Sequence, residues 1–77
     1  MNNWLKLSEL HKGFWEQCFV SIYDGVDIFT EINYVKKVEN TPFWYSETER
    51  EWFSFRSDID VRVLVIQYPK ITQEDFK

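Results

Sequence analysis

The chain has 77 residues, with four Trp, four Tyr and seven Phe, and its thirteen Asp and Glu against nine Lys and Arg give a formal net charge of −4. This length predicts one small domain, residues 1–77, near the lower limit of what folds without disulfides or metals. The acidic balance argues against a sequence-independent grip on the nucleic-acid backbone. The single cysteine excludes an internal disulfide and indicates a reducing compartment.

Neither export nor membrane insertion is indicated. The longest apolar run, Val63–Ile66, has only four residues, and Met1–Asn3 carries no charged leader. We therefore expect a cytoplasmic protein without membrane association.

The N-terminal segment Trp4–Leu10 fits two patterns. Trp4, Leu7 and Leu10 follow a helical spacing, whereas Leu5 and Leu7 alternate with polar residues as in a strand. We expect a short strand or extended entry that leads into one helical turn near Ser8, whose hydroxyl would cap it.

Two alternating segments, Gln17–Tyr23 and Val26–Lys36, predict the first hairpin. The residues that share a face are Cys18, Val20 and Ile22 in the first segment, and Val26, Ile28, Thr30, Ile32 and Tyr34 in the second. A two-residue turn would put these faces on opposite sides of the sheet, which is unfavourable.

A three-residue loop, Tyr23–Gly25, avoids this conflict. It sets Ile22 opposite Val26 and Val20 opposite Ile28, with Gly25 in the left-handed conformation that such loops require. Phe19, Tyr23 and Phe29 then share the other face, so both sides of this hairpin carry apolar surface and need covering.

A second hairpin and a last strand follow. Phe43–Tyr45 and Trp52–Phe55 are joined by the polar run Ser46–Glu51. The last strand is expected at Val61–Tyr68, where β-branched residues dominate, and Pro69 would end it or place it at a sheet edge. Residues 72–77 are expected to form a frayed tail.

The predicted fold is mainly β, or a β-rich α+β fold at most. We expect an antiparallel meander or half-open barrel of four or five strands with a short N-terminal turn or helix.

Catalytic and metal-binding patterns are sparse. His11 is the single histidine and is expected on the surface, while Cys18 is expected to be a buried structural thiol. One histidine and one cysteine do not make an ordinary zinc site. We predict no enzyme activity, no cofactor and no metal, with a carboxylate-based enzyme as a minor alternative.

Carboxylates recur at Glu47, Glu49 and Glu51, which would share a face if that stretch were extended, and Asp58 and Asp60 would add to the same edge. A solvated loop is the favoured interpretation, and an acidic contact surface for a basic partner is the alternative.

Most aromatic rings are expected in the core, but any that stay exposed beside this acidic edge would be interface anchors. The predicted protein-binding surface comprises Trp44, Tyr45, Glu47, Glu49, Glu51, Trp52, Asp58 and Asp60.

The opening Trp4–Leu10 and the segment Phe19–Gly25 resemble a family of small phage and prophage proteins of unknown function. Trp52–Phe53 and Val65–Pro69 are similar to that family's aromatic pair and late strand, but His11–Gly13 stands where the family has a proline. The resemblance implies a phage origin, hence the bacterial host cytoplasm, and no catalytic residues.

The leading functional hypothesis is a phage-type accessory protein that binds a host or defence protein, with inhibition as one form of this role. One alternative is a nucleic-acid-directed protein, which stacks single strands on Trp44 and Trp52 or mimics DNA with its carboxylates. Another is a small structural or oligomeric module, including a strand-paired homodimer.

Overall fold

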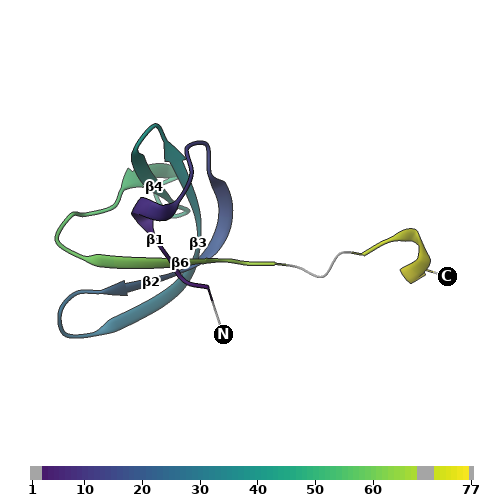
Figure 1. Cartoon of the computed structure of the whole chain (residues 1–77), viewed down its shortest axis with the longest axis horizontal. Coiled ribbons are helices and arrows are strands. Elements are labelled where there is room, and N and C mark those ends of the chain that lie inside the picture. The colour runs from purple at the N-terminus through teal and green to yellow at the C-terminus, as the bar shows by residue number, and fades with distance from the viewer. Residues whose placement is uncertain (1–2, 68–70, 77) are drawn as a thin grey trace.

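The computed structural model describes residues 3–67 and 71–76, and most of them form one open, six-stranded antiparallel sheet (Figure 1). The strands are β1 Leu5–Lys6, β2 Trp15–Tyr23, β3 Ile28–Val38, β4 Thr41–Ser46, β5 Glu51–Ser54 and β6 Asp60–Val65. Two short 3-10 helices, η1 Leu7–Glu9 and η2 Gln73–Phe76, complete the described elements. The prediction of a mainly antiparallel β fold is confirmed.

The strand order is β1-β6-β2-β3-β4-β5. Strands β2 to β5 therefore form a meander, and the chain then crosses back so that β6 pairs with β2 on the side away from β3. The sheet has six strands where four or five were expected.

The N-terminal segment is a strand followed by one helical turn, as predicted. Leu5 of β1 lies opposite Val63 of β6, and η1 follows directly. The predicted cap is wrong, because the turn begins one residue earlier, at Leu7. The Glu9 carboxylate accepts a hydrogen bond from the Lys6 backbone N–H at 2.7 Å and closes the turn in place of the Ser8 hydroxyl.

The predicted register of the first hairpin is wrong. Tyr23 lies opposite Ile28 and Ile22 opposite Phe29, so the loop has four residues, Asp24–Asp27, instead of three. Asp24 explains the longer loop, since its carboxylate accepts the backbone N–H groups of Val26 and Asp27, both at 2.8 Å. Gly25 has a φ of +98°, so its predicted left-handed conformation is confirmed.

This register places the apolar rows of β2 and β3 on opposite sides of the sheet. Val20 lies opposite Glu31 on one side, and Phe19 lies opposite Ile32 on the other. We call these sides the core face, which carries Cys18 and Val20, and the outer face, which carries Phe19 and Ile32. Phe29 thus belongs to the core face, not to the face of Phe19 and Tyr23.

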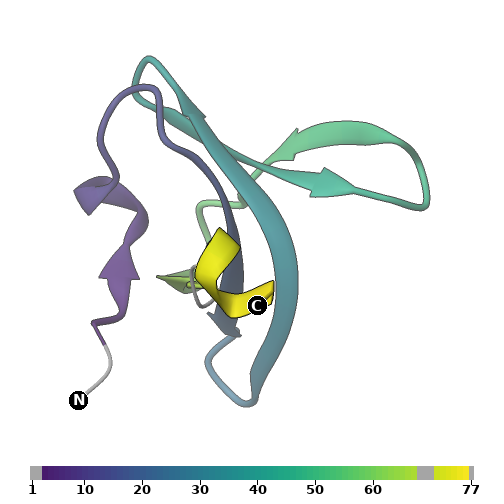
Figure 2. The same cartoon turned by 90° about the vertical axis from the view of Figure 1, so that its right-hand side faces the viewer.

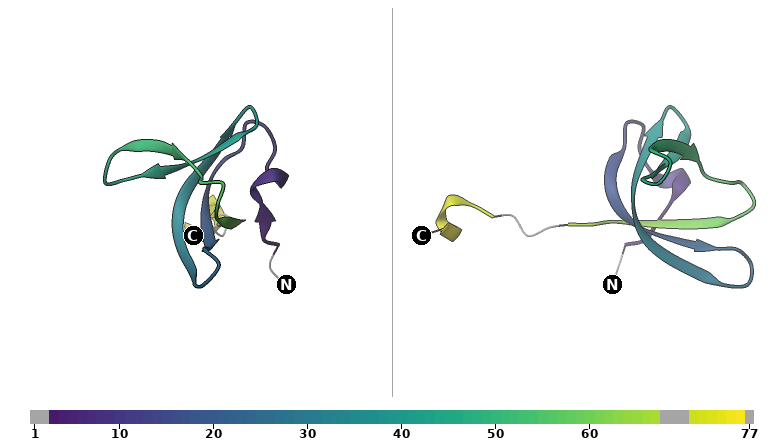
Figure 3. Two further views of the ribbon diagram at one scale, coloured as in Figure 1. Left: turned by 90° about the vertical axis from the view of Figure 1, so that its left-hand side faces the viewer. Right: turned by 180° about the vertical axis from the view of Figure 1, so that it is seen from behind.

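The predicted second hairpin is present, with Tyr45 opposite Trp52 and Trp44 opposite Phe53. Ser46 and Glu51 also pair, so the turn is shorter than the predicted polar run. This turn is closed by the Arg50 backbone N–H, which donates to the Ser46 carbonyl at 2.7 Å. Strand β4 pairs with β3 only from Val35 to Val38, and the hairpin then diverges from the β2–β3 hairpin (Figures 2 and 3).

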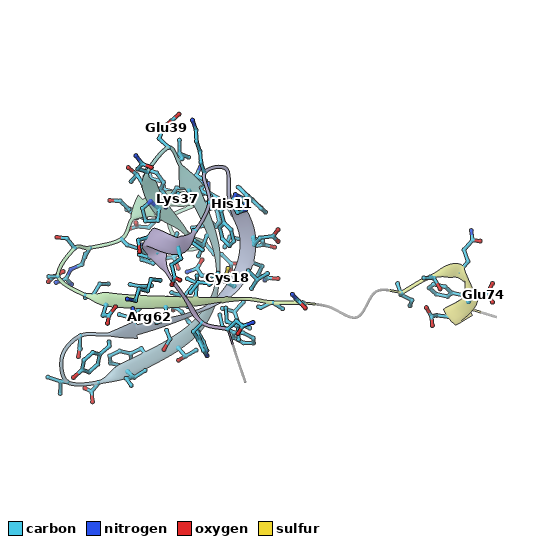
Figure 4. All side chains as sticks on the ribbon, viewed as in Figure 1. His11, Cys18, Lys37, Glu39, Arg62 and Glu74 are labelled. Carbon is cyan, nitrogen blue, oxygen red and sulfur yellow. The ribbon has the colours of Figure 1, made fainter. Side chains whose placement is uncertain are left out.

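The core lies where β2, β3 and β6 meet the N-terminal segment. Its buried residues are Leu10, Phe14, Cys18, Val20, Val35, Val61 and Val63. Lys37 fastens the N-terminal segment to β3, because its Nζ donates to the Leu10 carbonyl at 2.7 Å and to the Leu7 carbonyl at 3.4 Å (Figure 4). The N-terminal segment therefore covers part of the core face.

The last strand ends earlier than predicted, at Val65, and it pairs on both sides, so it is not an edge strand. The described edges of the sheet are β1 and β5, and β1 pairs with β6 only at Arg62 and Val63. The strand-paired homodimer stays a prediction. Tyr68 and Pro69 lie outside the described residues. Helix η2 stands apart from the sheet in Figure 1, and the frayed tail stays a prediction.

Candidate binding surfaces

The eight residues of the predicted binding surface do not form one surface. Trp44 lies on the core face and packs against Phe53, with ring centroids 5.4 Å apart. Tyr45 and Trp52 point to the outer face, where their centroids are 5.2 Å apart. Trp44 and Trp52 therefore do not form a shared stacking platform.

The carboxylates of the second hairpin are also dispersed. Glu47 and Glu49 lie in the turn, while Glu51 begins β5 opposite Ser46. Since the stretch is a turn and not a strand, the three do not alternate onto one face.

Asp58 and Asp60 are each paired with an arginine two residues away. Arg56 Nε donates to Asp58 Oδ1 at 2.9 Å, and Arg56 Nη2 donates to Asp58 Oδ2. Arg62 Nη1 donates to Asp60 Oδ1. The hydrogen bonds from Arg56 lower the pKa of Asp58, so this carboxylate is ionised and compensated. These two residues add little net negative charge to the surface.

The outer face of the two central strands is almost devoid of charge. Alternation places five residues of β2 and six of β3 on it, and Lys36 is the one charged side chain among them. The eleven residues are Trp15, Gln17, Phe19, Ser21, Tyr23, Ile28, Thr30, Ile32, Tyr34, Lys36 and Val38. The solvated face of an antiparallel sheet normally carries polar residues, so the low charge of this face is unusual.

Several of these side chains are well exposed. Ile28 is 69% exposed and lies opposite Tyr23, and Ile32 is 56% exposed and lies opposite Phe19. The two cross-strand pairs lie on either side of the Ser21–Thr30 pair, whose hydroxyl oxygens are 3.1 Å apart, and no described part of the chain buries them. Exposed apolar side chains gathered on one face in this way mark a candidate interaction surface.

An aromatic row extends this face toward the second hairpin. Trp15 packs against Tyr34 at 5.3 Å and against Trp52 at 6.1 Å between ring centroids. Lys36 Nζ lies 4.2 Å from the Trp52 ring centroid, a cation–π contact. The row joins β2, β3, β4 and β5 into one outer face.

A pocket of about 480 Å³ lies on the core side, between the β2–β3 hairpin and the segment that follows β5. Val20 and Ile22 form an apolar floor, and Trp44 and Phe53 form part of the wall. The pocket arises because the part of β3 before Val35 has no β4 partner. Its polar lining includes the exposed Glu31 and the half-buried Asn33.

The single histidine and cysteine carry no reactive arrangement. His11 is exposed, as predicted, and its Nδ1 lies 2.9 Å from the Lys12 carbonyl. Cys18 is fully buried, as predicted, and burial raises the pKa of its thiol to about 11 (Figure 4). Within residues 3–67 and 71–76, His, Cys, Asp and Glu form no cluster that could hold a metal ion.

No protein-family model, curated protein or solved structure is significantly similar to this chain. In the described part of the chain, no helix has the length and apolar character needed to cross a bilayer. The candidate site therefore rests on the geometry of the fold.

Sequence reasoning expected apolar surface on both sides of the first hairpin but assigned the wrong β3 residues to the outer face. The alternation of Ile28, Thr30, Ile32 and Tyr34 is visible in the sequence, but the expected register joined these residues to the core with Cys18 and Val20. The signal that would have found the face is the pair of core-facing polar residues, Glu31 and Asn33, which alternate with them.

Proposed function

We propose that this chain is a small, non-enzymatic, phage-type accessory protein that binds another protein through its outer face. The observation that supports this is the exposed apolar area around Ile28 and Ile32, on a face whose eleven central positions hold one charge. Large exposed apolar and aromatic side chains dominate binding energy at protein interfaces.

The charge of the chain indicates the kind of partner. A net charge of −4 favours association with a basic protein and disfavours a second copy, which would bring the same negative charge. The outer positions of β2 and β3 carry no carboxylate, and Asp60 of β6, which lies opposite Tyr23 on the same side of the sheet, is already paired with Arg62. The partner is thus a protein with an apolar contact centre and a basic surround.

The phage origin and the class of target come from the sequence resemblance. It supports a host or defence protein of the bacterial cytoplasm as the partner. Inhibition would follow if the outer face covers a working surface of that protein.

A photo-crosslinking amino acid at Ile32 tests the proposal. In host lysate, we expect a specific stoichiometric adduct, with none from the same group at Ile71, which lies outside the sheet. The captured protein is then purified and titrated against the intact chain by calorimetry. We expect Ile28→Ser/Ile32→Ser to weaken binding about tenfold or more.

Ile71→Ser is the matched control, since Ile71 is 64% exposed but lies outside the sheet. Equal affinities of the wild type, the double variant and this control would contradict the proposal. Light scattering at two concentrations tests for binding of a second copy of the chain. If the wild type is a dimer and the double variant is a monomer, the outer face mediates self-association instead.

A second candidate function is stacking of single-stranded nucleic acid. The aromatic row of Trp15, Tyr34 and Trp52 beside Lys36 favours it, because base stacking needs rings and a nearby cation. Tryptophan fluorescence titrated with oligonucleotides at low salt tests it. Quenching that saturates and falls with Lys36→Gln would support stacking over protein binding.

A further inference from the structure

The pocket on the core side and the outer face meet where β4 leaves β3. A second recess of about 430 Å³ lies at this divergence and shares Glu31, Asn33 and Trp44 with the pocket. Its other lining residues include Ile32 and Tyr45 of the outer face. We call the pocket and the recess together the fork. A partner on the outer face therefore reaches the fork without leaving the surface.

The pocket supplies the apolar part of the fork, whereas the recess is lined mainly by polar residues. Val20 and Ile22 form the floor, and the rings of Phe29, Trp44 and Phe53 line the walls. A volume of about 480 Å³ lies in the range of small-ligand sites and accommodates one or two side chains.

The mouth of the fork is negatively charged. Glu31 lines both hollows, and its carboxylate has no hydrogen-bond or ion-pair partner among the described residues. Glu47 adds a second carboxylate at the recess. Asp24 adds a third at the pocket, and its pKa is lowered because its carboxylate accepts backbone N–H groups, first that of Asp27.

Among the described residues that line the two hollows there is one cation, and it is already engaged. Arg56 lines the pocket but is bonded through two of its nitrogens to Asp58, which raises the pKa of the guanidinium. It is thus not free to neutralise Glu31. The fork combines an apolar floor, aromatic walls and an uncompensated acidic mouth.

We propose that the fork binds a basic amphipathic segment of the partner protein, with an apolar side chain on the floor and a neighbouring lysine or arginine paired with Glu31. The inference rests on the proposed protein-binding function and adds the chemistry of the segment that is recognised. The stem of the basic side chain lies against Trp44, where a cation beside the ring gains further attraction. Charge complementarity thus selects the segment, and the floor supplies its apolar contact.

Three capped dipeptides test the two halves of this site. The ¹⁵N-labelled chain is titrated by NMR with acetyl-Leu-Lys-amide, acetyl-Leu-norleucine-amide, which lacks the charge, and acetyl-Gly-Lys-amide, which lacks the apolar side chain. We expect the first to bind with a Kd on the order of millimolar and to shift the Trp44 indole N–H and the Glu31 amide. Each of the other two should bind about fivefold more weakly or worse.

Glu31→Gln should reduce acetyl-Leu-Lys-amide binding to the level of the norleucine peptide, while Glu49→Gln, an exposed carboxylate in the second turn, should leave it unchanged. Both variants should keep the wild-type spectrum away from the substitution. Equal binding of the charged and neutral peptides, or shifts that avoid Trp44 and Glu31, would overturn the assignment.

The failure of this inference is distinguishable from failure of the proposed function. Ile28→Ser should leave the dipeptide titration unchanged, because Ile28 lies on the outer face and lines neither hollow. If the peptides do not bind but the double variant loses the protein partner, the fork is wrong and the outer-face proposal stands. If the peptides bind and the partner binds the double variant as tightly as the wild type, the fork assignment stands and the outer-face proposal is wrong.

Discussion

The two faces of the β2–β3 pair differ sharply although both are rich in apolar residues. On the core face Cys18, Val20 and Val35 are at most 1% exposed, while on the outer face Ile28 and Ile32 are more than half exposed. The N-terminal segment and β6 contribute packing partners to the first face, whereas no described segment covers the second. The comparison shows that an alternating apolar row does not by itself identify the core. A row is buried only where another segment of the chain packs against it.

The largest expected effect separates the two faces directly. Val20→Asp buries a carboxylate among Val35 and Val63 and should destabilise the fold by about 3–5 kcal/mol, which unfolds a domain of this size. Ile32→Asp should cost at most about 1 kcal/mol, mainly through lower β propensity. Urea unfolding followed by tryptophan fluorescence measures both, and similar losses for the two variants would contradict the assignment of faces.

A smaller effect is expected at the contact that fastens the N-terminal segment over the core face. Lys37→Met keeps the apolar stem but removes the hydrogen bonds to the Leu7 and Leu10 carbonyls, so a loss of about 1.5–3 kcal/mol follows. Lys36→Met is the matched control on the outer face. Hydrogen exchange at the Leu10 amide, which donates to the Leu7 carbonyl, should quicken in the first variant alone.

The loop that sets which side chains face outward supplies the next prediction. Gly25 has a φ of +98°, and a methyl group at this position would meet open space, so Gly25→Ala should cost about 1 kcal/mol or more through the backbone alone. The melting temperature should fall by about 4–8 °C. Val26→Ala in the same loop is the control, and an unchanged melting temperature for Gly25→Ala would argue against this loop.

The last effect is confined to alkaline pH and concerns the thiol on the core face. Burial raises the pKa of Cys18 from 9.0 to about 11, so the folded state holds this proton more tightly than the unfolded state. This stabilising contribution is complete below about pH 9 and is lost as the pH rises through about 11. Iodoacetamide at pH 8 should label the unfolded chain and spare the folded one, whereas equal labelling would place Cys18 at the surface.

Local patterns were sufficient for much of the fold. The existence of the second hairpin is predictable because aromatic residues flank a single polar run, and the burial of Cys18 follows from its alternation with Val20 and Ile22. The strand and turn at the N-terminus are likewise readable from Leu5 and Leu7. The helical cap is not, because Glu9, rather than the more usual Ser8, supplies the accepting oxygen.

The candidate site depends on a strand register that the alternation of residues does not encode. Side chains alternate between the two faces along both β2 and β3. The amino-acid order therefore specifies which side chains share a face of one strand, but not which row of β2 lies on the same side of the sheet as which row of β3. That choice comes from the folded chain, through the Asp24 carboxylate, which holds a four-residue loop, and through β6, which packs beside β2. A shift in the register of one strand against its neighbour moves a whole apolar row from the core to solvent, and here it turns Ile28 and Ile32 from expected core residues into the candidate binding surface.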